Sequence, residues 1–205
     1  MRGLFITFEG TEGAGKSTLI KEIEKWLTQK GIDFVSVREP GGTVLAEKMR
    51  AILKTPCPEE KLCDKSELLL MYAARAQLVE TLIKPSLAEG KCVICDRHDL
   101  STVAYQGGGR GLPMDEIDSV RNVALGKFRP DLTLLLDIDP KLGMQRARSR
   151  GALDRFELEQ LSFFERVRNT YLEAAKYLPY IKVIDASKTV EEVRADAISA
   201  LEALL

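Results

Sequence analysis

Apolar and polar residues alternate along the chain in blocks whose periods predict strands and helices in turn. Five short and mostly apolar runs have the length and composition of buried strands, and they end near Phe8, Val37, Cys95, Asp137 and Ile184. The segments between these runs mostly carry apolar residues at helical spacing. This alternation predicts an α/β fold, in which a parallel sheet of about five strands has helices on both faces.

Three of the expected helices have informative patterns. The first ends before Gly31, and its apolar stripe consists of Leu19, Ile20, Ile23, Trp26 and Leu27. The last begins with a capping-box pattern at Thr189 and Glu192, and it is expected to bury Val193, Ala197, Ile198 and Leu201. A further apolar helix, from Glu67 to Leu87, fits either an internal core helix or the contact surface of a homodimer.

The length of the chain indicates a single domain. It has 205 residues, of which 45% are hydrophobic, and it shows no repeat, low-complexity tract or linker. We therefore expect one domain over residues 1–205. Lys and Arg number 30 against 31 Asp and Glu, so the overall charge gives no basis for nonspecific binding to nucleic acid or membrane. Any basic site must be local.

Compartment is inferred from the beginning of the chain and from the cysteines. The chain starts with Met1-Arg2-Gly3 and a five-residue apolar run, without the longer apolar stretch of a signal peptide or a membrane span. We expect a cytoplasmic protein with reduced thiols. Cys92 and Cys95 lie three apart in an expected strand and would face opposite sides, which disfavours a zinc cluster with Cys57 and Cys63.

The first candidate for chemistry is a glycine-rich segment between the first expected strand and helix. Its residues follow the pattern G-x-x-x-x-G-K-[ST], and the segment predicted to bind a nucleoside triphosphate is Gly10, Thr11, Glu12, Gly13, Ala14, Gly15, Lys16, Ser17 and Thr18. Backbone N–H groups of such a loop converge on phosphate oxygens at a helix N-terminus. Lys16 is expected to reach the β- and γ-phosphates, and Ser17 to supply a hydroxyl to Mg²⁺. Kinases, GTPases and motors all use this loop, so it does not identify the reaction.

Ligands of an open parallel sheet bind beyond the carboxyl ends of its strands. Asp96-Arg97-His98 follows the third expected strand, so we expect Asp96 to hold Mg²⁺ and Arg97 to bind a second anion. Asp137 and Asp139 compete with Asp96 for the metal. The single histidine, His98, is interpreted as a packing residue at a helix start.

Arginines supply the expected local basic site. Arg146, Arg148 and Arg150, with Arg155 shortly after, fit a lid that closes over the transferred phosphoryl group. A solvated helix face is the alternative. Arg75 lies on an apolar helix, where it faces either a pocket or the solvent.

Two glycine-rich segments are expected to form loops over the substrate crevice. One is Pro40-Gly41-Gly42, within Arg38 to Gly42 after the second strand, and the other runs from Gly107 to Gly111. A cis bond between Glu39 and Pro40 is one option.

Taken together, these segments resemble the thymidylate kinase family over nearly the whole chain. The resemblance rests on Phe8 to Thr18, Arg38 to Thr43, Tyr72 to Arg75, Asp96 to His98, Ala104 to Gly111 and Arg146 to Arg155. It implies a P-loop NTPase fold of the nucleoside monophosphate kinase type with a small mobile lid at about residues 141–156. It also implies a homodimer that transfers the γ-phosphate of Mg·ATP to dTMP, forming dTDP and ADP for dTTP synthesis.

The resemblance also implies roles for single residues. The expected catalytic groups are Lys16, Asp96, Arg97, Arg146, Arg148 and Arg150, with Ser17 and Asp96 as metal ligands. Glu12 would accept a hydrogen bond from the 3′-hydroxyl of dTMP, Arg97 and Arg38 would bind its phosphate, and Tyr105 would lie against its sugar. Thymine would be surrounded by Met71, Arg75, Ser101, Thr102 and Gln106, with Glu39 and Pro40 completing the substrate site.

This chain departs from many members at two positions. Met71 stands where many have a Phe that stacks on thymine, and a thioether against a ring contributes about 0.3–1.5 kcal/mol. Gly13 stands where some members, which have fewer lid arginines, carry a basic residue. The chain therefore resembles the class whose lid supplies the catalytic cation.

Three alternatives remain open at the level of sequence. One is another nucleoside monophosphate or small-metabolite kinase. A second is a GTP-dependent switch, which the absence of an Asn-Lys-x-Asp segment disfavours, because Asp185 to Lys188 is better placed to border adenine. A third is a nucleotide-binding module without catalytic activity.

Overall fold

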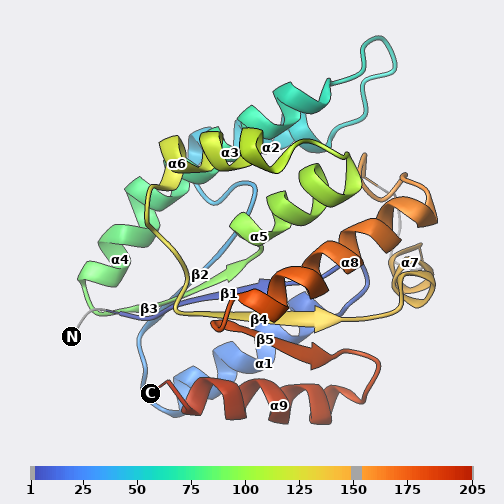
Figure 1. Ribbon diagram of the computed structural model, residues 1–205. Coiled ribbons are helices and arrows are strands. Elements are labelled where there is room, and N and C mark those ends of the chain that lie inside the picture. The colour runs from blue at the N-terminus through green and yellow to red at the C-terminus, as the bar shows by residue number, and fades with distance from the viewer. Residues whose placement is uncertain (1–2, 149–153, 205) are drawn as a thin grey trace.

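The computed structural model describes residues 3–148 and 154–204, apart from the side chain of Arg148. Five parallel strands form one sheet in the order β2-β3-β1-β4-β5 (Figure 1). The strands are β1 (Phe5–Glu9), β2 (Phe34–Arg38), β3 (Cys92–Asp96), β4 (Leu132–Asp137) and β5 (Ile181–Asp185). Each ends at the predicted position or one residue beyond it. The predicted parallel sheet is confirmed.

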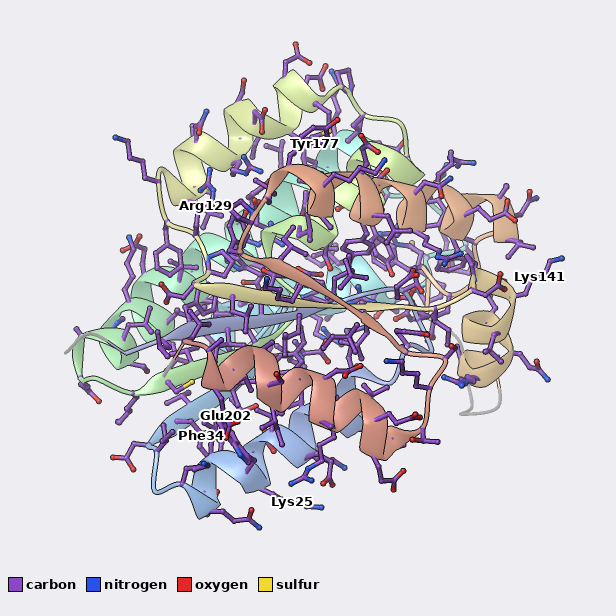
Figure 2. The ribbon with its side chains drawn as sticks, turned by 60° about the horizontal axis from the view of Figure 1, so that its bottom comes forward. Lys25, Phe34, Arg129, Lys141, Tyr177 and Glu202 are labelled. Carbon is purple, nitrogen blue, oxygen red and sulfur yellow. The ribbon has the colours of Figure 1, made fainter. Side chains whose placement is uncertain are left out.

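Helices cover both faces of the sheet. One face is covered by α1 (Lys16–Gln29) and α9 (Val190–Glu202), which lie side by side in Figure 1. The opposite face carries α3 (Asp64–Leu78), α4 (Lys84–Ala88), α5 (Asp99–Thr102), α6 (Met114–Leu125) and α8 (Leu161–Tyr177). Figure 2 shows the same layers from another side, with Lys25 and Glu202 on one side of the sheet and Tyr177 and Arg129 on the other. Helix α2 (Val44–Lys54) packs on α3, and α7 (Pro140–Arg148) follows β4.

Alternation along the strands divides the core between the two faces. In β1, Ile6 and Phe8 pack with α1 and α9, whereas Phe5 packs with the helices of the other face. Cys92 and Cys95 of β3 are divided in the same way, as expected from their spacing. Burial raises the pKa of the Cys92 thiol to about 11. Both thiols therefore serve as small apolar groups in the core.

The apolar helix expected from Glu67 to Leu87 is present as a continuous helical segment. A π-helical stretch, η1 (Val79–Ile83), joins α3 to α4. Its inner side, which includes Tyr72, Leu78 and Ile83, packs against the sheet, and Leu69 on the outer side is exposed. The interpretation as an internal core helix therefore accounts for the inner face. Across residues 3–148 and 154–204, no helix is both long and apolar enough to cross a membrane.

The second predicted glycine loop is wrong. Gly107, Gly108 and Gly109 belong to a π-helical segment, η2 (Val103–Gly109), that packs closely on α8. A Cβ atom at Gly108 would lie 2.1 Å from the Oγ1 atom of Thr170, and one at Gly109 would lie 2.4 Å from the Phe163 ring. These glycines therefore permit close helix contact. The first segment does form a turn, with φ of 130° at Gly41 and 88° at Gly42, and its Glu39–Pro40 bond is cis.

The register of the sheet brings three strand ends together. Phe8 of β1 and Arg38 of β2 both pair with Asp96 of β3. Because parallel strands end at the same edge, the segments that follow β1, β2 and β3 meet there. This edge is where the candidate site must be sought.

The capping box of α9 provides a test of the fold. Thr189 Oγ1 accepts a hydrogen bond from the N–H of Glu192 at 3.3 Å, and Glu192 accepts one from the N–H of Thr189 at 3.0 Å. We expect Thr189→Ala to lower the free energy of unfolding by about 1 kcal/mol, because the N–H of Glu192 loses its side-chain acceptor. Urea denaturation measures this change. Thr189→Ser keeps the hydroxyl and should stay close to the wild type, and equal losses in both variants would contradict the prediction.

Candidate active site

The predicted phosphate loop lies between β1 and α1. Gly10, Gly13 and Gly15 have φ values of 136°, 75° and 89°, which side chains rarely adopt. Gly15 is the N-cap of α1 and provides no side-chain cap. The loop therefore curls around the positive end of α1 and leaves its N-terminal N–H groups without a side-chain partner, which is the arrangement an anion requires.

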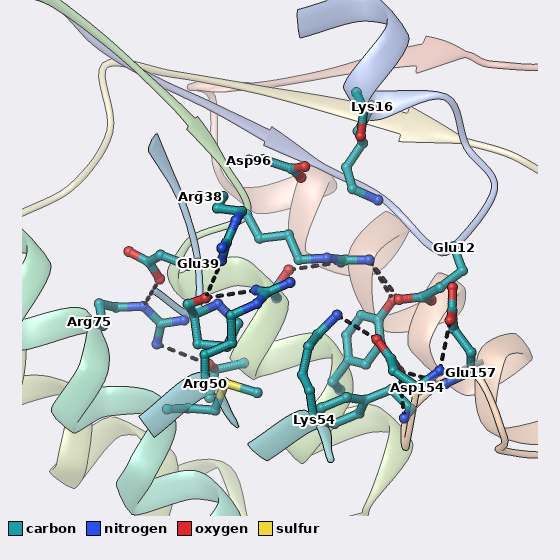
Figure 3. Close-up of a pocket in the computed structure, with 18 of the residues that line it drawn as sticks. Glu12, Lys16, Arg38, Glu39, Arg50, Lys54, Arg75, Asp96, Asp154 and Glu157 are labelled. Carbon is teal, nitrogen blue, oxygen red and sulfur yellow. Dashed lines mark hydrogen bonds and ion pairs between the residues drawn. The ribbon is translucent and has the colours of Figure 1, made fainter. Parts of the chain in front are cut away.

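Lys16 and Asp96 lie near each other at the inner end of this loop (Figure 3). Lys16 Nζ donates hydrogen bonds of 3.0 Å to the carbonyl oxygens of Gly10 and Thr11, so it is folded back across the loop. Burial lowers the pKa of Lys16 to about 8. Asp96 Oδ1 is buried and has no hydrogen-bond partner among the residues described. An unpartnered carboxylate oxygen at this position fits a hydrated or directly bound cation.

The two competing acids have other partners. Asp137 accepts hydrogen bonds of 2.7 and 2.8 Å from the Arg168 guanidinium. Asp139 accepts the N–H of Lys141 at 2.9 Å at the start of α7. Both carboxylates therefore have structural partners that Asp96 Oδ1 does not have.

Arg97 directly follows β3, at the edge of the sheet where β1, β2 and β3 end. Its φ of 71° is the only positive value at a non-glycine residue in the described ranges. One guanidinium nitrogen donates to the carbonyl oxygen of Gly10 at 2.9 Å, and the other donates to Glu12 at 2.8 Å and to the Tyr105 hydroxyl oxygen at 3.1 Å. The Tyr105 hydroxyl in turn donates to Glu12 at 2.5 Å. Three residues expected to serve the phosphate and sugar of one substrate thus form a single hydrogen-bonded group.

Arg75 anchors a second group. Its side chain is 2% exposed, so the alternative in which it reaches solvent is wrong. It donates to Glu39 at 2.6 Å, to the Thr102 hydroxyl at 2.9 Å and to the His98 carbonyl at 3.0 Å. Burial alone would raise the pKa of Glu39, but Arg75 and His98 opposite it hold that pKa below its usual value. Both Glu39 oxygens are occupied, because His98 Nδ1 lies 2.8 Å from the second one.

His98 is a packing residue, as expected. It is the N-cap residue of α5, and its ring packs edge-on against Phe5 at 5.0 Å between centroids. No local pattern indicated its contact with Glu39, because the two residues are 59 positions apart.

One cavity of about 230 Å³ joins both groups to the phosphate loop. The predicted residues that line it are Glu12, Gly13, Gly15, Lys16, Ser17, Thr18, Arg38, Glu39, Pro40, Met71, Arg75, Asp96, Arg97, Ser101, Thr102, Tyr105 and Gln106. Gly10, Thr11 and Ala14 belong to the loop but do not line the cavity. Met71 lines the cavity. The hydroxyl of its neighbour Tyr72 instead donates a hydrogen bond of 2.8 Å to Asp99.

The lid arginines are described only in part. Arg146 lies in α7 and donates to the carbonyl oxygen of Ala186 at 3.3 Å, within the segment expected to border adenine. It does not line the cavity. Arg148 ends α7, and its side chain lies outside the described residues, as does Arg150.

Five residues that line the cavity were not predicted, namely Arg50, Lys54, Asp154, Phe156 and Glu157. Arg50 donates to the carbonyl of Pro40 at 2.7 Å, and Lys54 pairs with Asp154 at 2.5 Å. Arg50 and Lys54 are four apart, so they share one face of α2, and that spacing was the available signal.

Six basic side chains, including Arg50 and Lys54, line the cavity of a chain whose formal net charge is −1. The basic site is local, as the composition required.

Helix α7 lies directly against the phosphate loop. A Cβ atom at Gly13 would lie 2.1 Å from the carbonyl oxygen of Gly143, and one at Gly143 would lie 2.5 Å from that of Glu12. Two glycines therefore allow loop and helix to touch through their backbones.

A phosphate loop, an acid at a neighbouring strand end and further basic side chains in the same cavity are typical of a P-loop enzyme of the nucleotide kinase class. The family model for thymidylate kinase matches residues 8–197. A thymidylate kinase of Shewanella sp. (strain MR-4) is 55% identical over 201 residues, which cover 98% of this chain and 96% of that protein. A thymidylate kinase of Vibrio vulnificus (strain YJ016) is 56% identical over 198 residues, or 96% of this chain and 93% of that one.

A solved structure agrees with these matches. The crystal structure of thymidylate kinase from Ehrlichia chaffeensis superposes with a TM-score of 0.79 at 33% identity, covering 98% of this chain and 99% of that one. The chain therefore belongs to the thymidylate kinase family.

The buried ammonium of Lys16 makes triphosphate binding depend on pH. Its pKa of about 8 means that Lys16 loses its proton in the empty site above that pH, and a bound triphosphate restores it by favouring the charged form. We expect ATP affinity to fall as pH rises above about 8, and binding at about pH 8.5 to take up roughly three quarters of a proton.

Titration calorimetry in buffers of different ionisation enthalpy measures this uptake. Lys16→Met should remove it while leaving the proton balance of other groups intact. Binding by the wild type without proton uptake at this pH would show that Lys16 is already charged in the empty site.

Proposed function

We propose that the protein transfers the γ-phosphate of Mg·ATP to dTMP, giving dTDP and ADP. The observation that carries this proposal is the single cavity that runs from Lys16 of the phosphate loop, past Arg97, to Arg75 and Gln106. The cavity thereby connects the phosphate loop to the proposed acceptor site. Membership of the thymidylate kinase family supports the same reaction.

In this reaction the acceptor is a phosphate monoester whose oxygen is already anionic, so no general base is needed. Catalysis consists of alignment and neutralisation of charge. Lys16 would bind the β- and γ-phosphates, and Arg97 would hold the dTMP phosphate with Arg38 nearby. Mg²⁺, which supplies charge neutralisation between the phosphates, would be held by Ser17 and Asp96, whose unpartnered Oδ1 fits that role.

The other end of the cavity suits a deoxynucleoside. Glu12 and Tyr105 form one hydrogen-bonded pair beside Arg97, where they would meet the 3′-hydroxyl and the C2′ face of the sugar. Arg75, Ser101, Thr102 and Gln106 would surround the polar edge of thymine, and Met71 would lie against its ring. Glu39 acts through Arg75, because both of its oxygens are already occupied.

We assign the remaining features on the same basis. Residues 1–205 form one domain with a lid at about 141–156, whose Arg146, Arg148 and Arg150 close over the transferred phosphoryl group. The protein is a cytoplasmic homodimer that associates through the outer side of the α3 to α4 helix, where Leu69 is exposed. Sedimentation tests the dimer.

An acceptor panel tests the reaction. ATP is supplied with dTMP, dUMP, dGMP, AMP or shikimate separately, and ADP release is measured. We expect dTMP to give the highest kcat/KM, because the cavity offers several polar partners to one base edge. Preference for another monophosphate would reassign the acceptor, and ATP binding without acceptor-dependent ADP would indicate a binding module.

Arg97 separates acceptor binding from donor binding. We expect Arg97→Ala to lower kcat/KM for dTMP by about 10²–10³-fold, because the guanidinium would neutralise the acceptor phosphate. ATP affinity, measured by calorimetry, should change by about twofold or less. Arg194→Ala, on α9 away from the cavity, serves as the control and should behave like the wild type. Near-normal dTMP turnover by Arg97→Ala would remove Arg97 from the acceptor site.

A further inference from the structure

Glu67 is a fully buried carboxylate in the first turn of α3, outside the lining of the cavity. Its Oε1 atom accepts hydrogen bonds from Gln106 Nε2 at 2.6 Å and from Arg110 Nε at 3.3 Å. Its Oε2 atom forms an ion pair with Arg155 at 2.5 Å. Both oxygens are therefore engaged, and two guanidinium groups balance the charge, as a buried carboxylate requires.

This carboxylate determines which way the Gln106 amide points. A glutamine amide has one arm that donates and one that accepts, whereas an ionised carboxylate only accepts. Turning the amide over would place its oxygen against Glu67 Oε1 and leave two acceptors facing each other without a proton. The nitrogen of Gln106 must therefore face Glu67. The Oε1 atom of Gln106 then remains available to accept a hydrogen bond in the cavity that Gln106 lines.

We propose that Glu67 is a positioning residue that sets the base specificity of the pocket through Gln106. With its nitrogen held by Glu67, Gln106 presents a hydrogen-bond acceptor to the base. A pyrimidine with N–H at ring position 3, such as thymine or uracil, satisfies that acceptor. A cytosine-type ring has a lone pair at the same position and is repelled. The inference rests on the proposed function, in which Gln106 borders the base.

The partners of Glu67 have further contacts of their own. Arg155 is itself fixed, because its Nε donates to the carbonyl oxygen of Leu53 at 2.8 Å. Arg110 also contacts Glu159. Gln106 is buried in η2, which packs on α8. The orientation of one amide is thus determined by contacts that Glu67 makes with Gln106, Arg110 and Arg155.

The test compares dTMP with 5-methyl-dCMP, which keeps the sugar, phosphate and methyl group and changes only the hydrogen-bonding edge of the base. In Glu67→Gln a neutral amide of the same size can donate or accept, so Gln106 populates both orientations. We expect the ratio of kcat/KM for dTMP to that for 5-methyl-dCMP to fall by about tenfold or more, mainly through the KM for dTMP. The KM for ATP should change by about twofold or less.

Arg110→Gln is the matched control, because it removes a partner of the same carboxylate without touching Gln106. It should lower the melting temperature but leave the ratio within about twofold of the wild type. A role of Glu67 in folding alone would reduce turnover of both nucleotides equally, so an unchanged ratio in Glu67→Gln overturns the inference.

A substrate analogue keeps the inference testable if Glu67→Gln does not fold. The 3-deaza analogue of dTMP has C–H in place of N3–H and a hydroxyl in place of the O4 carbonyl, and we expect the wild type to bind it about tenfold or more weakly than dTMP. Equal binding overturns the inference. Absence of dTMP turnover by the wild type would instead refute the proposed function, so the two failures are distinguishable.

Discussion

The arrangement of the site depends on the fixed position of Arg97. A non-glycine residue with φ of 71° costs roughly 1 kcal/mol or more, and it persists only where surrounding contacts hold it. Here the N–H of Arg97 donates to the carbonyl oxygen of Phe8. Its guanidinium donates to the carbonyl oxygen of Gly10 and to the carboxylate of Glu12. These contacts hold the guanidinium of Arg97 beside the phosphate loop, where the proposed acceptor phosphate would bind.

Charge in the cavity is arranged in pairs that differ in function. Arg75 and Glu39 are buried together and neutralise each other, so they contribute shape and hydrogen bonds rather than net potential. Lys16 has only backbone carbonyl partners for its hydrogen bonds, and Arg50 likewise donates to a carbonyl oxygen. These two cations therefore have no carboxylate among the hydrogen-bond partners named here, unlike Arg75.

The parts of the structure that local patterns determine were predictable. The strand ends, the phosphate loop and the capping box depend on residues within a few positions of one another. The joint hydrogen bonding of Arg97, Glu12 and Tyr105 spans about ninety positions, and only the family resemblance connected these residues. Gly108 was misassigned because a glycine looks alike in a loop and in a close helix contact. Glu67 gave no signal, because its partners come from distant elements.

The contact between Gly13 and Gly143 constrains how such enzymes can differ from one another. Any side chain at position 13 would have to push α7 outward, and α7 is the helix that carries Arg146 and Arg148. A cation placed on the loop and cations delivered by the helix thus compete for the same volume. A basic residue at position 13 therefore requires a displacement of α7 or of the loop in addition to the substitution itself.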